Sequence, residues 1–511
     1  MSVATASKVD TRWVEQTSEL DDLQTGAIRR ICNLSRQLPG DWSGMMGRDI
    51  VMGEDFSALR FQLSYMSYAL ALAHVHRLPA APGVFKKPLE NLITKMLHPD
   101  AWVYWSHAST GMGPFNKYLG PQEQQWNPVV KDNIMYSAYL QSMALMHHYI
   151  FRDDKYAKPG SLTIRLDTKF WHEGGFTFEY DENELNSLVY WQMAEQGFLG
   201  VACEPGCVFQ ICNQPSLIGF RMHDLINGGE MAEEASKGYI AAWEEFGMLD
   251  EQGNFKTLVL TGIRQPITVD MPQMNFWLMT LMHSWRPEIV EQQYPILMQR
   301  VLREGPDGAK WIINDNPRPH VDNGIDPQPL LPPIDMAWGA CAASEVGDTE
   351  TLNGLLTYAD RFMNAAWQDG GYYYKRRDAD FDENGNFVGM DAMAGNALLH
   401  YARLNVKDGL KKLYEGPLTD AHFEQPALVD LPEDLDVRRA IFNPQQDALA
   451  VTLGALAAGR KIALEIRAPK GRDLPLIVKD GVEIEPRVRR TEAGFSVEVH
   501  HHDRSTLVFQ W

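Results

Sequence analysis

The chain has 511 residues, of which 45% are hydrophobic and 22% are charged. This length exceeds one ordinary core and the composition is globular, so we exclude disorder and expect a large toroidal domain with an appendage, or two to three domains. The 47 basic and 67 acidic residues give a formal net charge of −20, which repels phosphate backbones, and we expect no nucleic-acid partner.

The sequence gives no signal for a membrane span or for export. No run of 18 apolar residues occurs, and the stretch from Met1 to Glu19 is polar. Five cysteines are an odd number for a disulfide framework. We therefore expect a cytoplasmic protein with reduced thiols and no membrane partner.

Helical periodicity dominates the first four fifths of the chain. Apolar residues recur at steps of three and four residues. The helices predicted from this pattern span 20–38, 59–76, 133–151, 187–197, 215–226, 230–246, 275–285, 291–302, 335–345, 349–366 and 390–404. The spacers are long and rich in Gly, Pro and Asn, which favours a toroid of helical hairpins over a compact bundle.

Strand patterns are confined to short hairpins and to the end of the chain. Residues 174–180 and 371–376 predict hairpins in connecting loops. Residues 405–436, rich in Pro and acidic side chains, predict a linker. After it, alternating segments predict strands at 448–453, 461–466, 476–478, 495–500 and 505–511. We predict a mainly α protein with a helical catalytic domain over 1–430 and a small antiparallel β-sandwich domain over 431–511.

The segment from Cys203 to Asn213 holds three of the five cysteines. Cys203 and Cys212 are nine residues apart, too far for a CxxC zinc or redox pair. Glu204 and Asn213 beside them are poor neighbours for an inert apolar core. A thiol, with a reference pKa of about 8.5, can exchange a proton near neutral pH without a metal. Three buried thiols in a loop between two helices are the simpler alternative.

Motifs for cofactors and metals are missing from the sequence. No phosphate-cradling glycine loop, GxSxG elbow or HExxH motif occurs, so we predict no cofactor and no metal. Residues Asp380 to Asp391 have the spacing of a calcium loop, but Asp replaces the usual Glu at the last position. A hairpin turn through Asn384, Gly385 and Asn386 is the simpler interpretation.

Two motifs together resemble the linalool dehydratase/isomerase family. One is Gly200-Val-Ala-Cys203-Glu204-Pro205, continued by Phe209 and Cys212-Asn213; the other is Lys131-Asp132-Asn133-Ile134-Met135-Tyr136. The resemblance is strongest over 41–250, faint to about 404 and absent from the β-rich tail. It implies an (α/α)6 barrel that works without a cofactor and eliminates water from, or isomerises, a tertiary or allylic terpene alcohol. A small hydrophobic substrate and a homo-oligomer are also implied.

The same resemblance assigns candidate site residues. Cys203 and Cys212 fall on the family's two active-site cysteines, Phe209 on an aromatic that packs the hydrocarbon chain, and Asp41 near an acidic residue that meets the alcohol. Tyr139 stands where the family has a histidine in reach of the substrate hydroxyl. A phenol, with a pKa of about 10, donates a hydrogen bond but exchanges protons less readily than imidazole, which favours a changed substrate. Further candidates for lining the substrate pocket are Trp42, Tyr65, Tyr68, Met135 and Tyr136.

Three functions follow from these observations. The first is a cofactor-independent lyase or isomerase acting on a hydrophobic isoprenoid or aromatic alcohol, with paired cysteines as acid and base; a covalent thioether is an equally open route. The second is a carbohydrate-active hydrolase or lyase on a helical toroid followed by a β-sandwich. Its candidate carboxylates are Asp41, Glu204, Asp270, Asp322 and Asp335. The third is a non-catalytic binder of apolar ligands, against which the retention of both cysteines speaks.

Overall fold

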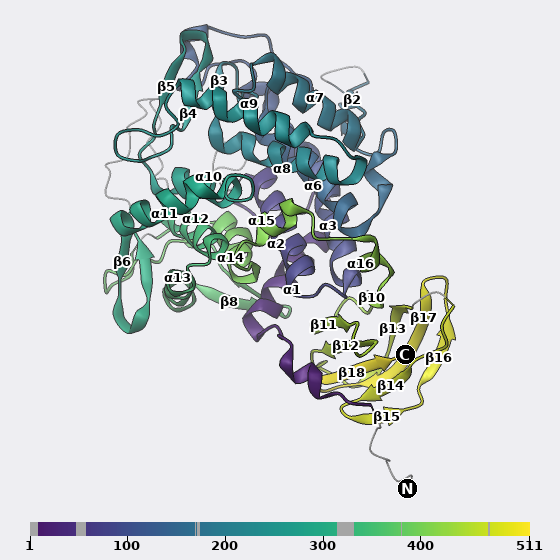
Figure 1. The fold of residues 1–511 in the computed structure, drawn as a ribbon. Helices are drawn as coiled ribbons and strands as arrows, with labels where there is room; N and C mark the ends of the chain where they lie inside the picture. The colour runs from purple at the N-terminus through teal and green to yellow at the C-terminus, as the bar shows by residue number, and fades with distance from the viewer. Residues whose placement is uncertain are drawn as a thin grey trace.

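The computed structural model describes residues 9–47, 58–168, 170, 174–313, 332–379, 381–468 and 471–511. Most of the helices come first along the chain, with only short strands between them. The two larger sheets lie at the carboxyl-terminal end (Figure 1). The architecture is therefore mainly helical with separate small sheets, as the apolar periodicity predicts. Among the described residues, no helix is long and apolar enough to cross a membrane.

Six helices pack side by side in a closed cycle. Each contacts the next in the order α2, α6, α8, α10, α12 and α14, and α14 contacts α2 again. Their bounds are α2 Leu59–His76, α6 Ile134–Phe151, α8 Gln210–Asn227, α10 Pro272–Met282, α12 Pro332–Val346 and α14 Leu399–Leu404. A helix with neighbours on all sides is apolar around most of its circumference, and α2 and α6 are buried along almost their whole length.

A second set of helices packs against this cycle. Each of its members contacts one or two of the six inner helices. Their bounds are α1 Asp22–Arg36, α3 Pro82–Met96, α7 Glu182–Glu195, α9 Met231–Glu245, α11 Pro287–Val301 and α13 Thr349–Phe362. Helix α1 shows the expected amphipathic pattern, because it buries Ile28, Ile31 and Leu34 and exposes polar residues such as Asp22.

Short elements connect the helices. The two predicted hairpins are present, since β1 pairs with β2 and β8 with β9. The short strands are β1 Ile164–Leu166, β2 Phe176–Phe178, β3 Cys207–Phe209, β4 Leu258–Leu260, β5 Gln265–Ile267, β6 Leu302–Glu304, β7 Lys310–Ile312, β8 Ala365–Gln368 and β9 Gly371–Tyr374. The short helices are α4 Pro99–Trp102, α5 Trp105–Ala108 and η6 Ala394–Leu398, the last in π-helical form directly before α14.

The prediction of a linker over 405–436 is wrong. This segment contains helices α15 (Gly409–Glu415) and α16 (Asp420–Glu424) and strand β10 (Ala427–Asp430). Helix α15 buries Leu410 and Leu413. The prolines and acidic residues that suggested a linker fall largely between these short elements, where they end one element before the next begins.

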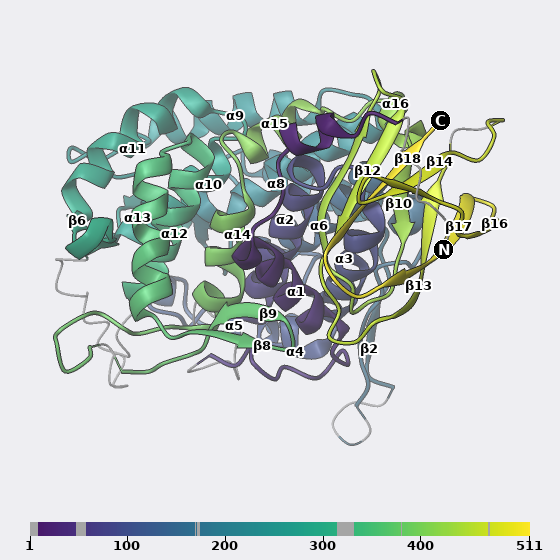
Figure 2. The same cartoon turned by 90° about the horizontal axis from the view of Figure 1, so that it is seen from below.

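Two antiparallel sheets form the end of the chain (Figure 2). Their strand orders are β10-β13-β17-β16 and β11-β12-β18-β14-β15. The bounds are β11 Val437–Asn443, β12 Ala448–Leu453, β13 Arg460–Arg467, β14 Leu476–Lys479, β15 Val482–Ile484, β16 Arg487–Arg490, β17 Gly494–His501 and β18 Ser505–Gln510. The rings of Phe495 and Phe509, one from each sheet, have centroids 5.9 Å apart, so the sheets share a core. All the strands predicted here are present. Strand β10, which lies within the predicted helical domain that ends at residue 430, also pairs with them.

The beginning of the chain packs on the second of these sheets. A 3₁₀ helix, η1 (Arg12–Gln16), buries Val14 against Ala448, Ala450, Val478 and Val508. The purple amino-terminal segment lies beside the strands in Figure 1. Strand β12 is consequently buried along its whole length, because one face meets the partner sheet and the other meets this segment.

Candidate active site

A tight turn places Cys203. The Cys203 N–H donates to the Cys207 carbonyl and the Cys207 N–H donates to the Glu204 carbonyl, each at 2.9 Å. Pro205 followed by Gly206 at φ +74° is the residue pair typical of a type II turn, which needs a positive φ at its third residue. The turn holds the Cys203 and Glu204 backbone in a fixed conformation.

Asn213 joins this turn to α8. Its amide oxygen accepts from the Val201 N–H at 2.8 Å, and its amide nitrogen donates to the Val201 and Phe209 carbonyls at 3.0 and 2.8 Å. The side chain is fully buried. Because Asn213 follows Cys212 directly on α8, these bonds fix the distance between the two cysteine-bearing segments.

Cys212 lies on a helix and not in a loop. The pattern predicts a helix starting at Pro215, but α8 begins at Gln210 and includes that proline. Pro215 lies in the second turn of α8, and the buried Asn213 and Gln214 bonds hold the helix through it. Cys212 is therefore the third residue of α8, close to its amino-terminal end.

The second motif reaches the same place. The Ile134 N–H, at the start of α6, donates to the Ala202 carbonyl at 3.1 Å. Asp132 and Asn133 both have a positive φ, 56° and 60°, which is costly for residues other than glycine. The Asn133 side chain stabilises this conformation, since it accepts from the Tyr104 hydroxyl at 2.5 Å and donates to the Pro128 carbonyl at 2.9 Å.

The two sulfurs of Cys203 and Cys212 meet in the interior. Both residues are buried. Burial, then the neighbouring Cys212 thiol and the Glu204 carboxylate, raise the pKa of the Cys203 thiol well above its usual value. Cys203 consequently keeps its proton at neutral pH.

Tyr139 on α6 lies beside this pair. Burial, followed by the neighbouring Tyr65 and Cys212, raises the pKa of its phenol, so it is a neutral hydrogen-bond donor or acceptor. The Tyr139 and Tyr65 oxygens are 3.2 Å apart, and the Trp277 indole N–H donates to the Tyr65 oxygen at 2.5 Å. A chain of polar atoms thus runs through an otherwise apolar interior.

Aromatic rings surround these polar atoms. Phe61 meets Tyr139 edge to face at 5.5 Å between centroids, and Tyr65 meets Trp338 in the same way at 4.7 Å. Trp277 and Trp338 are stacked at 4.9 Å. These rings come from α2, α6, α10 and α12, so the closed cycle of helices directs its aromatic side chains towards its centre.

Glu204 lies between the cysteines and the protein surface. Its burial raises the pKa of its carboxyl group from 4.5 to about 7, against the opposing effect of the Arg60 guanidinium. Asp132, which also raises this pKa, lines a polar cavity of about 210 Å³ together with Trp105, Lys131 and Pro205. Glu204 is therefore a carboxyl group that changes its charge near neutral pH, next to Cys203 in the chain and to Pro205, which lines the cavity.

A family model for linalool dehydratase/isomerase matches residues 60–380. The chain belongs to the linalool dehydratase/isomerase family. The match covers α2, α6 and α8 together with both sequence motifs, and extends to 380, beyond the region in which the resemblance is strong. It begins after Asp41.

Solved structures similar to this family member are hydrolases of low sequence identity. They include the GH76A alpha-1,6-mannanase from Salegentibacter sp. HEL1_6, with 13% identity and a TM-score of 0.38 over 76% of this chain and 99% of that one. An alpha-amylase from Clostridium perfringens matches with 11% identity and a TM-score of 0.36 over 68% and 86%. The GH127 beta-L-arabinofuranosidase from Geobacillus stearothermophilus T6 matches with 10% identity and a TM-score of 0.32 over 95% and 75%. Likeness at this level says nothing about activity.

The structure brings only some of the predicted site residues together. Cys203, Cys212, Tyr139 and Tyr65 form one buried group. Tyr68 lies next to it, stacked on Tyr139, with its hydroxyl bonded to Ser142 at 2.5 Å.

The other predicted residues make separate contacts. The Asp41 carboxylate is exposed and accepts from Ser43, and the Trp42 indole donates to Asp100 at 2.8 Å. The Tyr136 hydroxyl donates to the Met96 carbonyl at 3.0 Å. Phe209 packs edge to face on Phe115, and the Met135 sulfur contacts the Arg60 guanidinium at 3.4 Å.

The carboxylates of the carbohydrate alternative are spread over the molecule. Asp335 accepts from the Gln273 N–H near the start of α10, and Asp270 lies 3.8 Å from Arg300 at the surface. Asp322 lies outside the described residues, as does Asp380 of the calcium-like loop. In that loop, Asp382 accepts from the N–H groups of Asn384 and Asn386, which closes a turn.

Three side chains at the site were not assigned by the sequence motifs. The Arg60 guanidinium lies 3.9 Å from the centre of the Tyr104 ring, and both are close to Glu204. Trp277 belongs to α10, far along the chain from the motifs. The sequence points to Tyr104 only through the several aromatic residues around it. No local pattern identifies an arginine or a tryptophan that reaches a site formed by distant segments.

Proposed function

We propose that this protein is a cofactor-independent lyase or isomerase that removes water from, or rearranges, a hydrophobic isoprenoid or aromatic alcohol. The observation that carries the proposal is the pair of neighbouring buried thiols, Cys203 and Cys212, close to the buried Tyr139 and its aromatic neighbours. Family membership supports a lyase or isomerase. The paired-cysteine chemistry and the substrate are our own proposals.

The proton balance of the reaction divides the roles of the two thiols. Cys203, which holds its proton, donates it to the substrate hydroxyl, and the C–O bond breaks to release water. We propose that Cys212, close to the amino-terminal end of α8 where negative charge is stabilised, is the base that accepts a proton from the neighbouring carbon. Transfer of that proton from Cys212 to Cys203 then restores the starting state.

The aromatic surroundings suit this reaction. Loss of water from a tertiary or allylic alcohol builds positive charge on carbon in the transition state. The faces of Trp, Tyr and Phe rings attract cations, and the effect grows when water is excluded. Trp277, Trp338 and Phe61 supply such rings around Tyr139 and Tyr65.

Tyr139 is proposed to hold the substrate hydroxyl. Trp277 donates to the Tyr65 oxygen, which leaves the Tyr65 proton available for the Tyr139 oxygen and directs the Tyr139 proton away from Tyr65. We expect Tyr139→Phe to lower kcat by about tenfold or more, the effect of one lost hydrogen bond. Tyr136→Phe, three residues away on α6, is the control, because its hydroxyl bonds Met96 instead. Steady-state kinetics of both variants check the assignment, and equal losses contradict it.

Glu204 is proposed to exchange protons between the thiols and solvent. The folded protein holds the Glu204 proton up to a pKa of about 7, whereas the unfolded chain releases it near 4.5. The stabilisation that protonated Glu204 gives the folded protein, measured relative to Glu204→Gln, is therefore complete below about pH 4.5. It is lost as the pH rises through 7. From pH 5 to pH 8, the wild type should lose about 2 kcal/mol of unfolding free energy relative to the variant. Urea unfolding at both pH values measures this, and a difference that does not change with pH contradicts it.

A substrate screen tests the proposed function directly. The purified protein is incubated with tertiary and allylic terpene alcohols, aromatic alcohols, glycosides and polysaccharides. Formation of dehydrated or rearranged products, detected by gas chromatography and mass spectrometry, supports the proposal. Release of reducing sugar alone would favour the carbohydrate alternative, and binding of an alcohol without turnover would favour a non-catalytic binder.

Finer points of architecture also belong to the proposal. The closed cycle of six helices with an outer set against it supports an (α/α)6 barrel, and the two sheets with a shared core support a β-sandwich. Homo-oligomerisation stays a prediction from the family resemblance, and light scattering of the purified protein checks it.

A further inference from the structure

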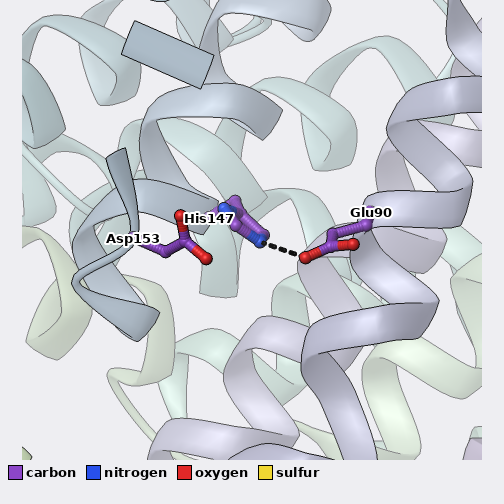
Figure 3. A group of neighbouring side chains, drawn as sticks. All are labelled: Glu90, His147 and Asp153. Atoms are coloured by element: carbon purple, nitrogen blue, oxygen red, sulfur yellow. Dashed lines mark ion pairs between the residues drawn. The ribbon is translucent and has the colours of Figure 1, made fainter. Parts of the chain in front are cut away.

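Two groups of histidine and carboxylate side chains gather away from the cysteines. The first consists of Glu90, His147 and Asp153, and Figure 3 shows the His147 ring between the two carboxylates. Lysines accompany both carboxylates: Lys155 lies 2.9 Å from Glu90, and Lys86 lies 2.5 Å from Asp153. A metal ion would have to displace these ammonium groups, so the first group is a network of ion pairs.

The second group has a different electrostatic environment. It consists of His283 at the end of α10, Glu291 on α11 and Asp408 before α15, whose ligand atoms all lie within 4.8 Å of one another. Among the described residues, the ion pairs of Glu291 and Asp408 are with His283 alone. Two carboxylates therefore face one imidazole without a lysine or arginine between them.

The distances in this group do not fit direct hydrogen bonds. His283 is buried, and its Nε2 lies 3.6 Å from Glu291 and 4.0 Å from Asp408, beyond the 2.7–3.2 Å or so that an N–H···O bond takes. No hydrogen-bond partner of Nε2 occurs in the described part of the chain. Two ligand atoms bound to one zinc ion at about 2.1 Å lie about 3.4 Å apart in tetrahedral geometry. The distances from His283 Nε2 to the Glu291 and Asp408 oxygens would have to shorten by only about 0.2 to 0.6 Å to reach this spacing.

The other nitrogen of His283 supports the same interpretation. Its Nδ1 lies 3.4 Å from the buried Glu345 carboxylate. Glu345 in turn accepts from the Asn405 side chain and from the N–H groups of Leu410 and Lys411 at the start of α15, which fixes the position of its carboxylate. A carboxylate on Nδ1 fixes the imidazole with its Nε2 lone pair outward, which is the usual support of a metal-binding histidine.

We propose that His283, Glu291 and Asp408 bind a divalent transition-metal ion of the zinc type, with Glu345 orienting the imidazole. An imidazole ligand favours this class over calcium or magnesium, which prefer oxygen ligands alone. The site joins the α10–α11 hairpin to α15.

The proposed site lies far from the cysteines. Arg60, at the start of α2, is close to Glu204, whereas His76, at its end, bonds the Gly409 carbonyl next to Asp408. A rise of 1.5 Å per residue separates these ends by about 24 Å. The metal therefore stabilises the fold and takes no part in the proposed chemistry, so its test is independent of the proposed function.

The test measures zinc binding by the full-length protein after chelator treatment and dialysis. Titration calorimetry and metal analysis should give one bound Zn²⁺ per chain and a raised Tm. Glu291→Gln alters an exposed side chain and should leave folding intact. Loss of a residue that only hydrogen bonds a metal ligand weakens metal affinity by roughly 10- to 100-fold, and loss of the ligand Glu291 itself should weaken zinc affinity by more than that. Asp408→Asn should act in the same direction.

Matched controls locate the ion. Glu288→Gln changes an exposed carboxylate on the same helix, and Asp153→Asn changes the lysine-paired group; both should bind zinc as the wild type does. A wild-type protein that binds no zinc overturns the proposal. So does zinc binding of unchanged affinity in both Glu291→Gln and Asp408→Asn, because the ion would then lie elsewhere, for example at His500 to His502.

Discussion

Replacing Cys203 or Cys212 by alanine is expected to lower kcat by about 10²- to 10⁴-fold, the usual contribution of one general acid or base. In the proposed reaction each thiol has one half of the proton balance, and the two buried residues are neighbours. The loss should therefore be similar for both single variants, and the double variant should lose little more. Single-turnover and steady-state rates on the substrate found in the screen measure these effects.

Cys207 provides the matched control for this prediction. It is a buried thiol only four residues from Cys203, but it packs with Leu258 and Leu260 instead of with the second cysteine. Cys207→Ala should keep wild-type kcat. If Cys203→Ala and Cys212→Ala also keep the wild-type rate, the paired-thiol chemistry is wrong.

Gly200→Ala is expected to lower the free energy of unfolding by at least about 3 kcal/mol, from a strained backbone and lost hydrogen bonds. Gly200 has φ +132°, and a Cβ added there would lie 2.7 Å from the Asn213 side chain. Asn213 cannot move aside without breaking its bonds to Val201 and Phe209. Because those bonds hold Cys203 against Cys212, activity should fall together with stability.

A second glycine separates the clash from the backbone strain. Gly197 has φ +61°, but it is exposed and has no atom within 4 Å of an added Cβ. Gly197→Ala should cost only the conformational term of about 1–2 kcal/mol and should leave kcat unchanged. Urea unfolding of both variants makes the comparison. Equal losses would show that Asn213 does not hold the turn.

Local patterns predicted much of the fold. Helix α2 agrees with its predicted range at both ends, and α6 starts one residue later than predicted, since each is a long apolar segment with clear limits. Helix α3 was not predicted. It contains Pro82 and Pro88, and the burial of Phe85, Leu89 and Leu92 in the core outweighs the hydrogen bond that Pro88 cannot make.

The candidate site was predicted as far as its sequence motifs extend. The motifs locate Cys203, Cys212 and Tyr139 through their resemblance to the family, in which a histidine stands at the position of Tyr139. Arg60, Trp277 and Trp338 reach the same centre from separate helices, and only the closed packing of the six helices reveals them. The group around His283 escaped prediction for the same reason, because its ligands come from three distant segments that share no spacing.

The contact between the segment around η1 and the strands near the carboxyl-terminal end affects synthesis as well as stability. Val14 is covered by β12, β14 and β18, and Glu19 pairs with Arg438 and Arg504. The strands that cover Val14 and the arginines that pair with Glu19 all follow the helical part in the sequence, so these contacts form late in synthesis. Val14 therefore stays uncovered by β12, β14 and β18 until those strands have been made, and exposed apolar side chains during synthesis favour aggregation.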